Sequence, residues 1–256
     1  MNKIIKSKKI YLSLVTIITL IILLLLPLAL NLHNSYAHFF NYLKNHHLSP
    51  VSQKVYNFGN NEAGNLNYVL LGDSLTDGVG NIDPGATLPA IYAGHLQNQQ
   101  KSGTLTKLAQ AGATTKDVIT NQVPEAIELY PDYILIMIGT NDIHNPITPW
   151  EFKQQYSKML DELNNKTRAE ITVVNIPYIG SDQILLPPWN IILDWRMQQF
   201  NKIIQEVAKK RNIKVIDLYT TTKNQFIKSS ELYSIDQFHP SDKGYRLWAD
   251  TILPQW

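Results

Sequence analysis

The sequence predicts an α/β fold, a three-layer α/β/α sandwich around a parallel sheet, preceded by one N-terminal transmembrane helix. Three observations support this prediction. From residue 67 onward, short runs rich in β-branched residues alternate with longer stretches of helical spacing. The chain opens with a basic stub and an apolar run of 20 residues without a charge. Residues 66–256 are then enough for one domain with a sizeable core.

The first 30 residues predict a membrane anchor. The apolar run at 11–30 is long enough to cross a hydrocarbon layer of about 30 Å. Basic residues flanking such a run stay in the cytoplasm, so the rest of the chain is expected outside it. The stub carries Lys3, Lys6, Lys8 and Lys9 and no acid. We therefore expect a single-pass signal-anchor over 1–30 in the cell membrane.

The alternative is a secretory signal that is cleaved near Ala37, since Ser35-Tyr36-Ala37 has the small-x-small pattern of such sites. Residues 31–65 are rich in Asn, His, Ser and Tyr without a sustained period, which predicts a polar extracytoplasmic stalk. Four histidines fall in this stretch without acidic or cysteine partners among them, which favours a solvated linker over a metal site: His33, His38, His46 and His47.

The remaining residues, 66–256, give the α/β pattern. Compact β-branched runs of the kind buried on both faces of a parallel sheet occur at 67–71, 104–109, 132–138, 171–176 and 213–218. Helical spacing is found at 88–100, 115–129, 149–164, 190–211 and 242–253. Thr148 with Pro149 and Glu151 is typical of a capped helix start, and Ser241 can cap the last helix in the same way.

Composition excludes several classes of function. No cysteine is present, which excludes disulfides, thiolate catalysis and thiolate-bound metals. The net charge of +2 comes from the membrane end, because without the four N-terminal lysines 19 basic residues stand against 21 acidic ones. We therefore expect no nucleic-acid partner.

A serine follows the first predicted strand, in Gly72-Asp73-Ser74-Leu75. At a strand-to-helix turn, the helix N-terminus offers free N–H groups and partial positive charge, which suit an alkoxide nucleophile. Thr76 stands where the G-x-S-x-G elbow has its second glycine, and no phosphate-loop lysine follows. Taken alone, the motif is equally compatible with a simple helix cap.

A serine nucleophile needs a base, and imidazole is the usual one near neutral pH. Three histidines lie in the predicted domain. His95 falls inside a predicted helix, which indicates packing or surface, and His144 follows the third strand and is possible. His239 is preceded by Asp236, and a carboxylate three residues earlier can fix its tautomer and stabilise the imidazolium.

Two further strand ends supply candidates for an oxyanion hole. Asn141, in Gly139-Thr140-Asn141-Asp142, can direct its side-chain N–H at a developing oxyanion, or can serve only as a turn residue. Gly112, after the second strand, lets its backbone approach the same position.

These four blocks, in this order at successive strand ends, resemble the SGNH or GDSL-type serine hydrolases, a family of esterases and lipases. The resemblance covers about residues 66–256. It implies a flavodoxin-like sandwich with five parallel strands, and ester hydrolysis through an acyl-enzyme without a metal or organic cofactor. It implies Ser74 as nucleophile, His239 as base and Asp236 as the residue that orients it. The oxyanion hole would comprise the N–H groups of Ser74 and Gly112 with the side chain of Asn141. Residues 109–111 read Ala-Gln-Ala where many members carry an asparagine.

The substrate is left open by the sequence. Residues 177–189 are apolar and proline-marked, and either form an acyl-binding wall or simply pack on the neighbouring helix. With the membrane-proximal location, they favour lipid or lysolipid esters. The alternatives are a deacetylase or acyltransferase acting on cell-wall polysaccharide or peptidoglycan, and a non-catalytic, membrane-tethered binding module. The oligomeric state is not indicated.

Overall fold

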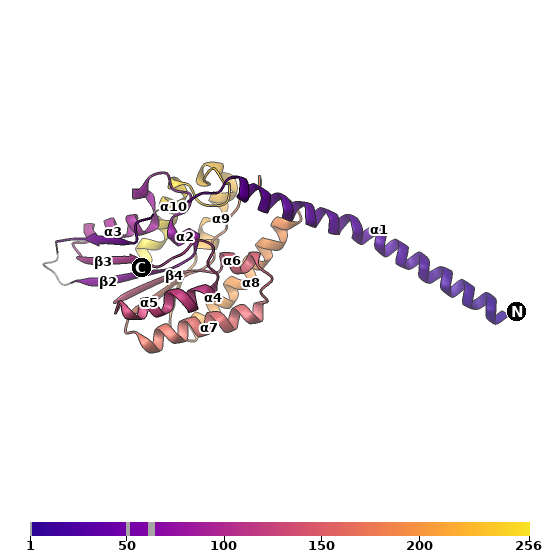
Figure 1. Ribbon diagram of the computed structural model, residues 1–256, viewed down its shortest axis with the longest axis horizontal. Coiled ribbons are helices and arrows are strands. Elements are labelled where there is room, and N and C mark those ends of the chain that lie inside the picture. Colours follow the sequence, from indigo (N-terminus) through magenta and orange to yellow (C-terminus); the bar gives the residue numbers. More distant parts are fainter. Residues whose placement is uncertain (1, 50–51, 61–64) are drawn as a thin grey trace.

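The computed structural model describes residues 2–49, 52–60 and 65–256 as a sheet between two helical layers, with one long helix projecting from it (Figure 1). The sheet has the strand order β1-β3-β2-β4-β5-β6. Its strands are β1 (Val55–Phe58), β2 (Leu66–Gly72), β3 (Gly103–Lys107), β4 (Tyr133–Met137), β5 (Glu170–Val174) and β6 (Lys214–Ile216). All neighbours are parallel except β1, which runs antiparallel to β3.

Helices cover both faces of the sheet, as the continuous apolar runs predict. The helices of the domain are α2 (Ser74–Asp77), α3 (Leu88–Asn98), α4 (Thr115–Asp117), α5 (Val123–Glu128), α6 (Thr140–His144), α7 (Pro149–Lys166), α8 (Trp189–Lys209), α9 (Leu218–Lys228) and α10 (Asp242–Ile252). In Figure 1, α3 and α10 lie on one side of the sheet and α5 and α7 on the other. Short helical turns complete the chain: Pro84–Ala86, Val118–Gln122, Ser230–Leu232 and Leu253–Gln255.

The central strands carry the core. Leu70 and Leu71 of β2 and Ile134 and Ile136 of β4 are inaccessible to solvent. Gly72 of β2 pairs with Met137 of β4, so the two strands end at the same level. Their carboxyl ends therefore present the loops that follow them at a single edge of the sheet.

The expected helix starts are confirmed. Thr148 accepts a hydrogen bond from the backbone N–H of Glu151, and the Glu151 carboxylate accepts one from the N–H of Thr148, which is a capping box. Ser241 accepts from the N–H of Gly244 at the start of α10. Helix α9, with its buried Leu218 and Phe226, was not among the predicted helices.

The sheet differs from the prediction of five parallel strands, because a sixth strand, β1, adds an antiparallel edge. Tyr56 and Phe58 point inward and are buried, while Val55 and Asn57 point outward. Alternation over four residues is too short to stand out against the polar residues around it, and pairing with β3 is what makes the segment a strand.

The expected stalk at 31–65 also differs from the structure. Helix α1 (Asn2–Asn45) runs without interruption from the apolar segment to the domain, so residues 31–45 of the expected stalk are helical. Only part of the expected stalk is irregular. Phe39 is 1% exposed and Ser35 is 3% exposed, so the last turns of α1 pack on the domain. Local sequence does not reveal this, because the partners of Phe39 lie more than 100 residues away. The boundary between stalk and domain at residue 65 remains a prediction.

One helix among the described residues is long and apolar enough to cross a membrane, within Ser13–Asn45. Tyr11 and the large apolar side chains from Leu14 to Leu30 are 42–75% exposed, and in Figure 1 this part of α1 projects away from the domain. Exposed apolar side chains along such a length are costly in water, so the helix fits a lipid surrounding.

Candidate active site

A serine, a histidine and an aspartate lie in a hydrogen-bonded row at the carboxyl edge of the sheet. His239 Nε2 lies 2.8 Å from Ser74 Oγ, and His239 Nδ1 lies 2.6 Å from Asp236 Oδ2. With Nδ1 protonated and donating to the carboxylate, Nε2 is free to accept the serine proton. The row therefore has the geometry of an activated serine nucleophile.

Asp236 is held by more than the imidazole. Its Oδ1 accepts hydrogen bonds from Ser234 Oγ at 2.7 Å and from the N–H groups of Phe238 and His239 at 2.9 Å. Burial alone would raise the pKa of this carboxyl, but the bond to His239 and these other donors outweigh it, and the pKa is lowered. Asp236 is therefore ionised at neutral pH and fixes the orientation of His239. Ser234 was not identified from the sequence.

Ser74 is the first residue of α2, directly after β2. Asp73 caps this helix, accepting from the N–H of Leu75 at 3.0 Å, and the helix stops after one turn at Gly78, which has a φ of 87°. The strand end before it is fixed by Gln122, whose side chain both accepts from the N–H of Gly72 and donates to its carbonyl. This buried pair of hydrogen bonds was also not identified from the sequence, where Gln122 is simply part of a helical stretch.

The loops of Gly112 and Asn141 are joined to each other. Asn141 Nδ2 donates to the carbonyl of Ala113 at 2.9 Å, which commits one of its two N–H bonds and orients the other. Asp142 Oδ2 accepts from the backbone N–H of Thr115 at 2.9 Å. Gly112 has a φ of 82°, is exposed, and has no atom within 4 Å of the position a Cβ would occupy. Its backbone is thus open to a ligand.

Arg196 of α8 stabilises the loop that carries Asn141. Its guanidinium donates to four backbone carbonyls at the end of α6 and beyond, those of Asp142, Ile143, Asn145 and Ile147, at 2.7–3.2 Å. These carbonyls have no helical partner of their own, because α6 ends at His144. Arg196 comes 55 residues after Asn141 in the sequence, with no motif to connect them.

Neither of the two other candidate histidines, His95 and His144, hydrogen-bonds to Ser74 in the described part of the chain. His95 is half-buried in α3 and bonds Gln99 at 2.8 Å, as expected for a helix-surface residue. His144 is half-buried, and its two ring nitrogens, which are inaccessible to solvent, have no hydrogen-bond partner among the described residues. Burial, with the charge of Arg196, lowers the pKa of His144 to about 3, so it stays neutral and acts as an aromatic packing group.

The apolar loop at 177–189 mainly packs. Ile179, Ile184 and Leu185 are 0–3% exposed, so these side chains are core residues and not a free acyl-binding wall. Leu186, at 38% exposed, is the large apolar side chain of the loop that faces solvent. The loop also meets the anchor helix, since His38 Nε2 donates to the carbonyl of Gln183 at 2.9 Å.

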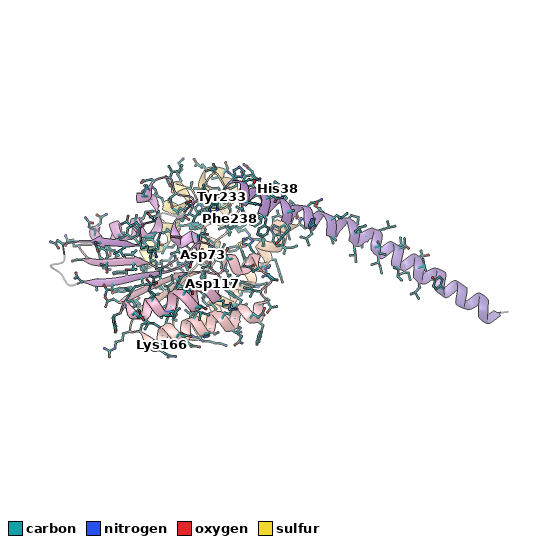
Figure 2. All side chains as sticks on the ribbon, viewed as in Figure 1. His38, Asp73, Asp117, Lys166, Tyr233 and Phe238 are labelled. Atoms are coloured by element: carbon teal, nitrogen blue, oxygen red, sulfur yellow. The ribbon has the colours of Figure 1, made fainter. Side chains whose placement is uncertain are left out.

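Two carboxyl groups are buried beneath the serine. Asp73 is inaccessible to solvent, and its Oδ2 has no partner within the described part of the chain, nor has Oδ1 of Asp142. Burial raises the pKa of Asp73 to about 7, and the nearby Asp142 adds to the effect. Burial likewise raises the pKa of Asp142 to about 6. Figure 2 shows Asp73 in the interior of the domain, below Phe238.

The domain is similar in sequence to known proteins. The model of the GDSL-like Lipase/Acylhydrolase family matches residues 70–247. A spore germination lipase of Bacillus licheniformis is 25% identical over 218 residues, which cover 73% of this chain and 94% of that protein. An acetylxylan esterase of Xylanibacter ruminicola is also 25% identical, but the chain spans only 42% of its length.

Solved structures agree at the level of the fold. A lipase/acylhydrolase from Enterococcus faecalis superposes with a TM-score of 0.60 at 24% identity, covering 74% of this chain and 94% of the other. An acetylxylan esterase from Geobacillus stearothermophilus gives 0.59 at 21% identity, covering 74% and 93%.

We expect Ser74→Ala to abolish hydrolysis of p-nitrophenyl acetate without unfolding the protein. Loss of a serine nucleophile costs on the order of 10⁶ in kcat, because only binding and oxyanion effects remain. Asp236→Asn keeps the shape of the carboxylate but removes its charge, so its loss should be smaller than that of His239→Ala. Hydrolysis rates, with thermal unfolding measured in parallel, test this. A Ser74→Ala enzyme within tenfold of the wild type would refute the assignment.

Asp73 should make the stability depend on pH. A carboxyl whose pKa is raised from 3.8 to about 7 on folding binds its proton more tightly in the folded state. The folded state is therefore progressively destabilised as pH rises from about 4 to about 7. Asp73→Asn keeps the helix cap and removes the titration. The melting temperature of the variant, relative to the wild type, should rise across this range.

A suitable control is Asp161→Asn, since Arg211 lowers the pKa of that carboxyl. The Asp161 carboxylate contributes fully to the stability above the pKa that it has in the unfolded chain. The difference in melting temperature between Asp161→Asn and the wild type should therefore stay constant between pH 5 and 7. If the difference in melting temperature between Asp73→Asn and the wild type is equally constant, the folded protein does not bind a proton at Asp73 in this pH range, and the prediction is wrong.

Proposed function

Because this chain belongs to the GDSL-like lipase/acylhydrolase family and is a carboxylic ester hydrolase, we propose that it cleaves lipid or lysolipid esters at the outer face of the cell membrane. The observation that carries the proposal is the contact between the anchor helix and the loop that carries Asp236 and His239. Phe39 of α1 packs edge-on against Phe238, with ring centres 5.6 Å apart. Phe238 is the residue before His239.

In the proposed reaction, Ser74 Oγ attacks the ester carbonyl carbon while its proton passes to His239 Nε2. The charge of Asp236 stabilises the imidazolium that forms. The oxyanion is stabilised by the N–H groups of Ser74 and Gly112 and by the free N–H of Asn141. The alcohol leaves with the proton from His239. Water, activated by the same imidazole, then hydrolyses the acyl-serine and releases the acid. None of these steps calls for a metal or cofactor.

The distance from the membrane favours a lipid substrate. Phe39 lies nine residues after the end of the apolar run, which on a continuous helix is about 14 Å. The headgroup region adds about 5–8 Å to each side of the hydrocarbon layer. A rigid helix of this length would hold the carboxyl edge of the sheet beside the lipid headgroups, closer than a flexible stalk would.

A second candidate is deacetylation of cell-wall polysaccharide, which the acetylxylan esterase relatives favour. Acyl transfer between envelope molecules would use the same residues, with an alcohol in place of water. A binding module without turnover is less well supported, because it has no need of an aligned Ser74, His239 and Asp236.

Esters of increasing chain length separate these substrates. We expect the full chain, in detergent micelles, to hydrolyse p-nitrophenyl esters with a kcat/KM that rises from acetate towards longer chains, since each buried methylene contributes about 0.8 kcal/mol. The Ser74→Ala variant gives the background rate. A maximum at acetate, with little activity on longer esters, would favour the polysaccharide deacetylase instead.

The same proposal requires an extracytoplasmic domain that stays attached to the membrane. Protease added to intact spheroplasts should digest or release the domain, while a cytoplasmic marker protein stays intact. Retention of α1 is supported by Ser35 and Phe39, which are buried on either side of the alternative cleavage point at Ala37. A domain protected until lysis would exclude this orientation, and a protein in the medium beginning at His38 would show a cleaved signal.

A further inference from the structure

A cavity of about 590 Å³ lies between the anchor helix and the α/β domain. We call it the helix–domain cavity. One wall is a single face of α1 and the other is formed by α6 and α8. Its apolar lining includes Ala29, Leu32, Tyr36, Ile143, Trp189 and Ile192.

The walls of the helix–domain cavity are firmly built. Tyr36 packs edge-on against Trp189 with ring centres 5.2 Å apart, which joins the two walls. Arg196 also lines the cavity, but its guanidinium is occupied by the four carbonyls of the α6 loop. What remains for an occupant is mostly carbon surface, which suits an apolar ligand.

The size of the cavity suits a long hydrocarbon chain. Ligand sites in proteins have volumes of about 300–1,000 Å³. At roughly 30 Å³ for a group the size of a water molecule, this cavity holds about 20 such groups. A methylene group is of comparable size, so a complete fatty acyl chain can be accommodated.

The cavity extends from the apolar segment of α1 toward the site, and the packed rings of Phe39, His144 and Phe238 lie between its inner end and His239. Ala29 belongs to the apolar run itself, and Tyr36 lies seven residues, or about 10 Å, further along the helix. At the other end, Ile143 is two residues from Asn141. His144 stacks on Phe39 at 5.0 Å and lies 5.5 Å from Phe238, beside His239. Figure 2 labels His38 at the domain end of α1.

We propose that the helix–domain cavity takes up one acyl chain of a membrane lipid, which enters sideways from the outer leaflet and is held there while its ester reaches Ser74. Polar residues such as His33 and Asn145 also line the cavity, but most of its surface is carbon, and beside the hydrocarbon layer such a surface is better covered by a lipid chain than by water. The anchor helix is then one wall of the substrate site as well as a tether. This inference rests on the proposed function, because it identifies where the lipid substrate binds.

The first experiment fills the cavity from the helix side. Ala29→Trp places a bulky ring in it, and Asn34→Trp is the matched control. Asn34 is exposed and lies about 140° around the helix from Ala29. With the full chain in phosphatidylcholine–phosphatidylglycerol vesicles, Ala29→Trp should lower kcat/KM for a palmitoyl ester at least tenfold and leave the acetyl ester within twofold. Asn34→Trp should leave both within twofold.

The second experiment detects the chain directly. In the Ser74→Ala background, a phosphatidylcholine with a diazirine at the end of one acyl chain should crosslink to Leu32 and Ile192 on illumination, as mapped by mass spectrometry. Adding Ala29→Trp should remove these crosslinks, and adding Asn34→Trp should not. Crosslinks confined to residues 11–28, or unchanged by Ala29→Trp, would overturn the inference.

The two readouts separate this inference from the function it rests on. Strong palmitoyl activity that Ala29→Trp does not change would leave the lipid esterase standing and refute the cavity as its acyl site. A wild type that hydrolyses acetyl esters only would refute the lipid function, and the cavity would fail as a substrate site with it. Crosslinks at Leu32 would in that case identify a bound structural lipid.

Discussion

The carboxylate of Asp236 is the interaction on which the arrangement at the carboxyl edge depends. It accepts hydrogen bonds from Ser234 Oγ, from two backbone N–H groups and from His239 Nδ1. Four donors on one buried carboxylate leave the imidazole a single orientation, and that orientation points Nε2 at Ser74. The hydrogen bond between His239 Nε2 and Ser74 Oγ joins residues that are 165 positions apart in the sequence. The loop before α10 and the turn after β2 are thereby fixed relative to each other.

The rest of the site is stabilised by polar side chains that hydrogen-bond to the backbone. Gln122 secures the end of β2, and Arg196 secures the loop after α6. Asn141 itself donates to the carbonyl of Ala113. Each of these groups satisfies backbone atoms that the ends of short helices and strands leave without partners. A site built from loops and from helices of only one turn can be rigid in this way.

The anchor helix brings a second constraint to the same edge. Its last turns do not form a linker but pack on the domain through Phe39, with His144 as an uncharged aromatic partner. Because the helix is continuous, the distance and direction from its apolar segment to the site are set by helical geometry. A flexible connection of the same number of residues would leave both free.

The sequence by itself determined the alternation of strands and helices, the long apolar helix at the N-terminus, and the identity of the residues at the strand ends. These follow from local patterns: β-branched runs, helical spacing, capping residues and short motifs such as Asp236-x-x-His239. The edge strand β1, helix α9 and the role of residues 31–45 were missed, because their conformation depends on partners distant in the chain. Gln122 and Arg196 carry no local signal at all. Only the tertiary structure could bring them to the backbone groups they bind, which lie about 50 residues away in the sequence, since hydrogen bonding between distant segments depends on position in space and not on spacing along the chain.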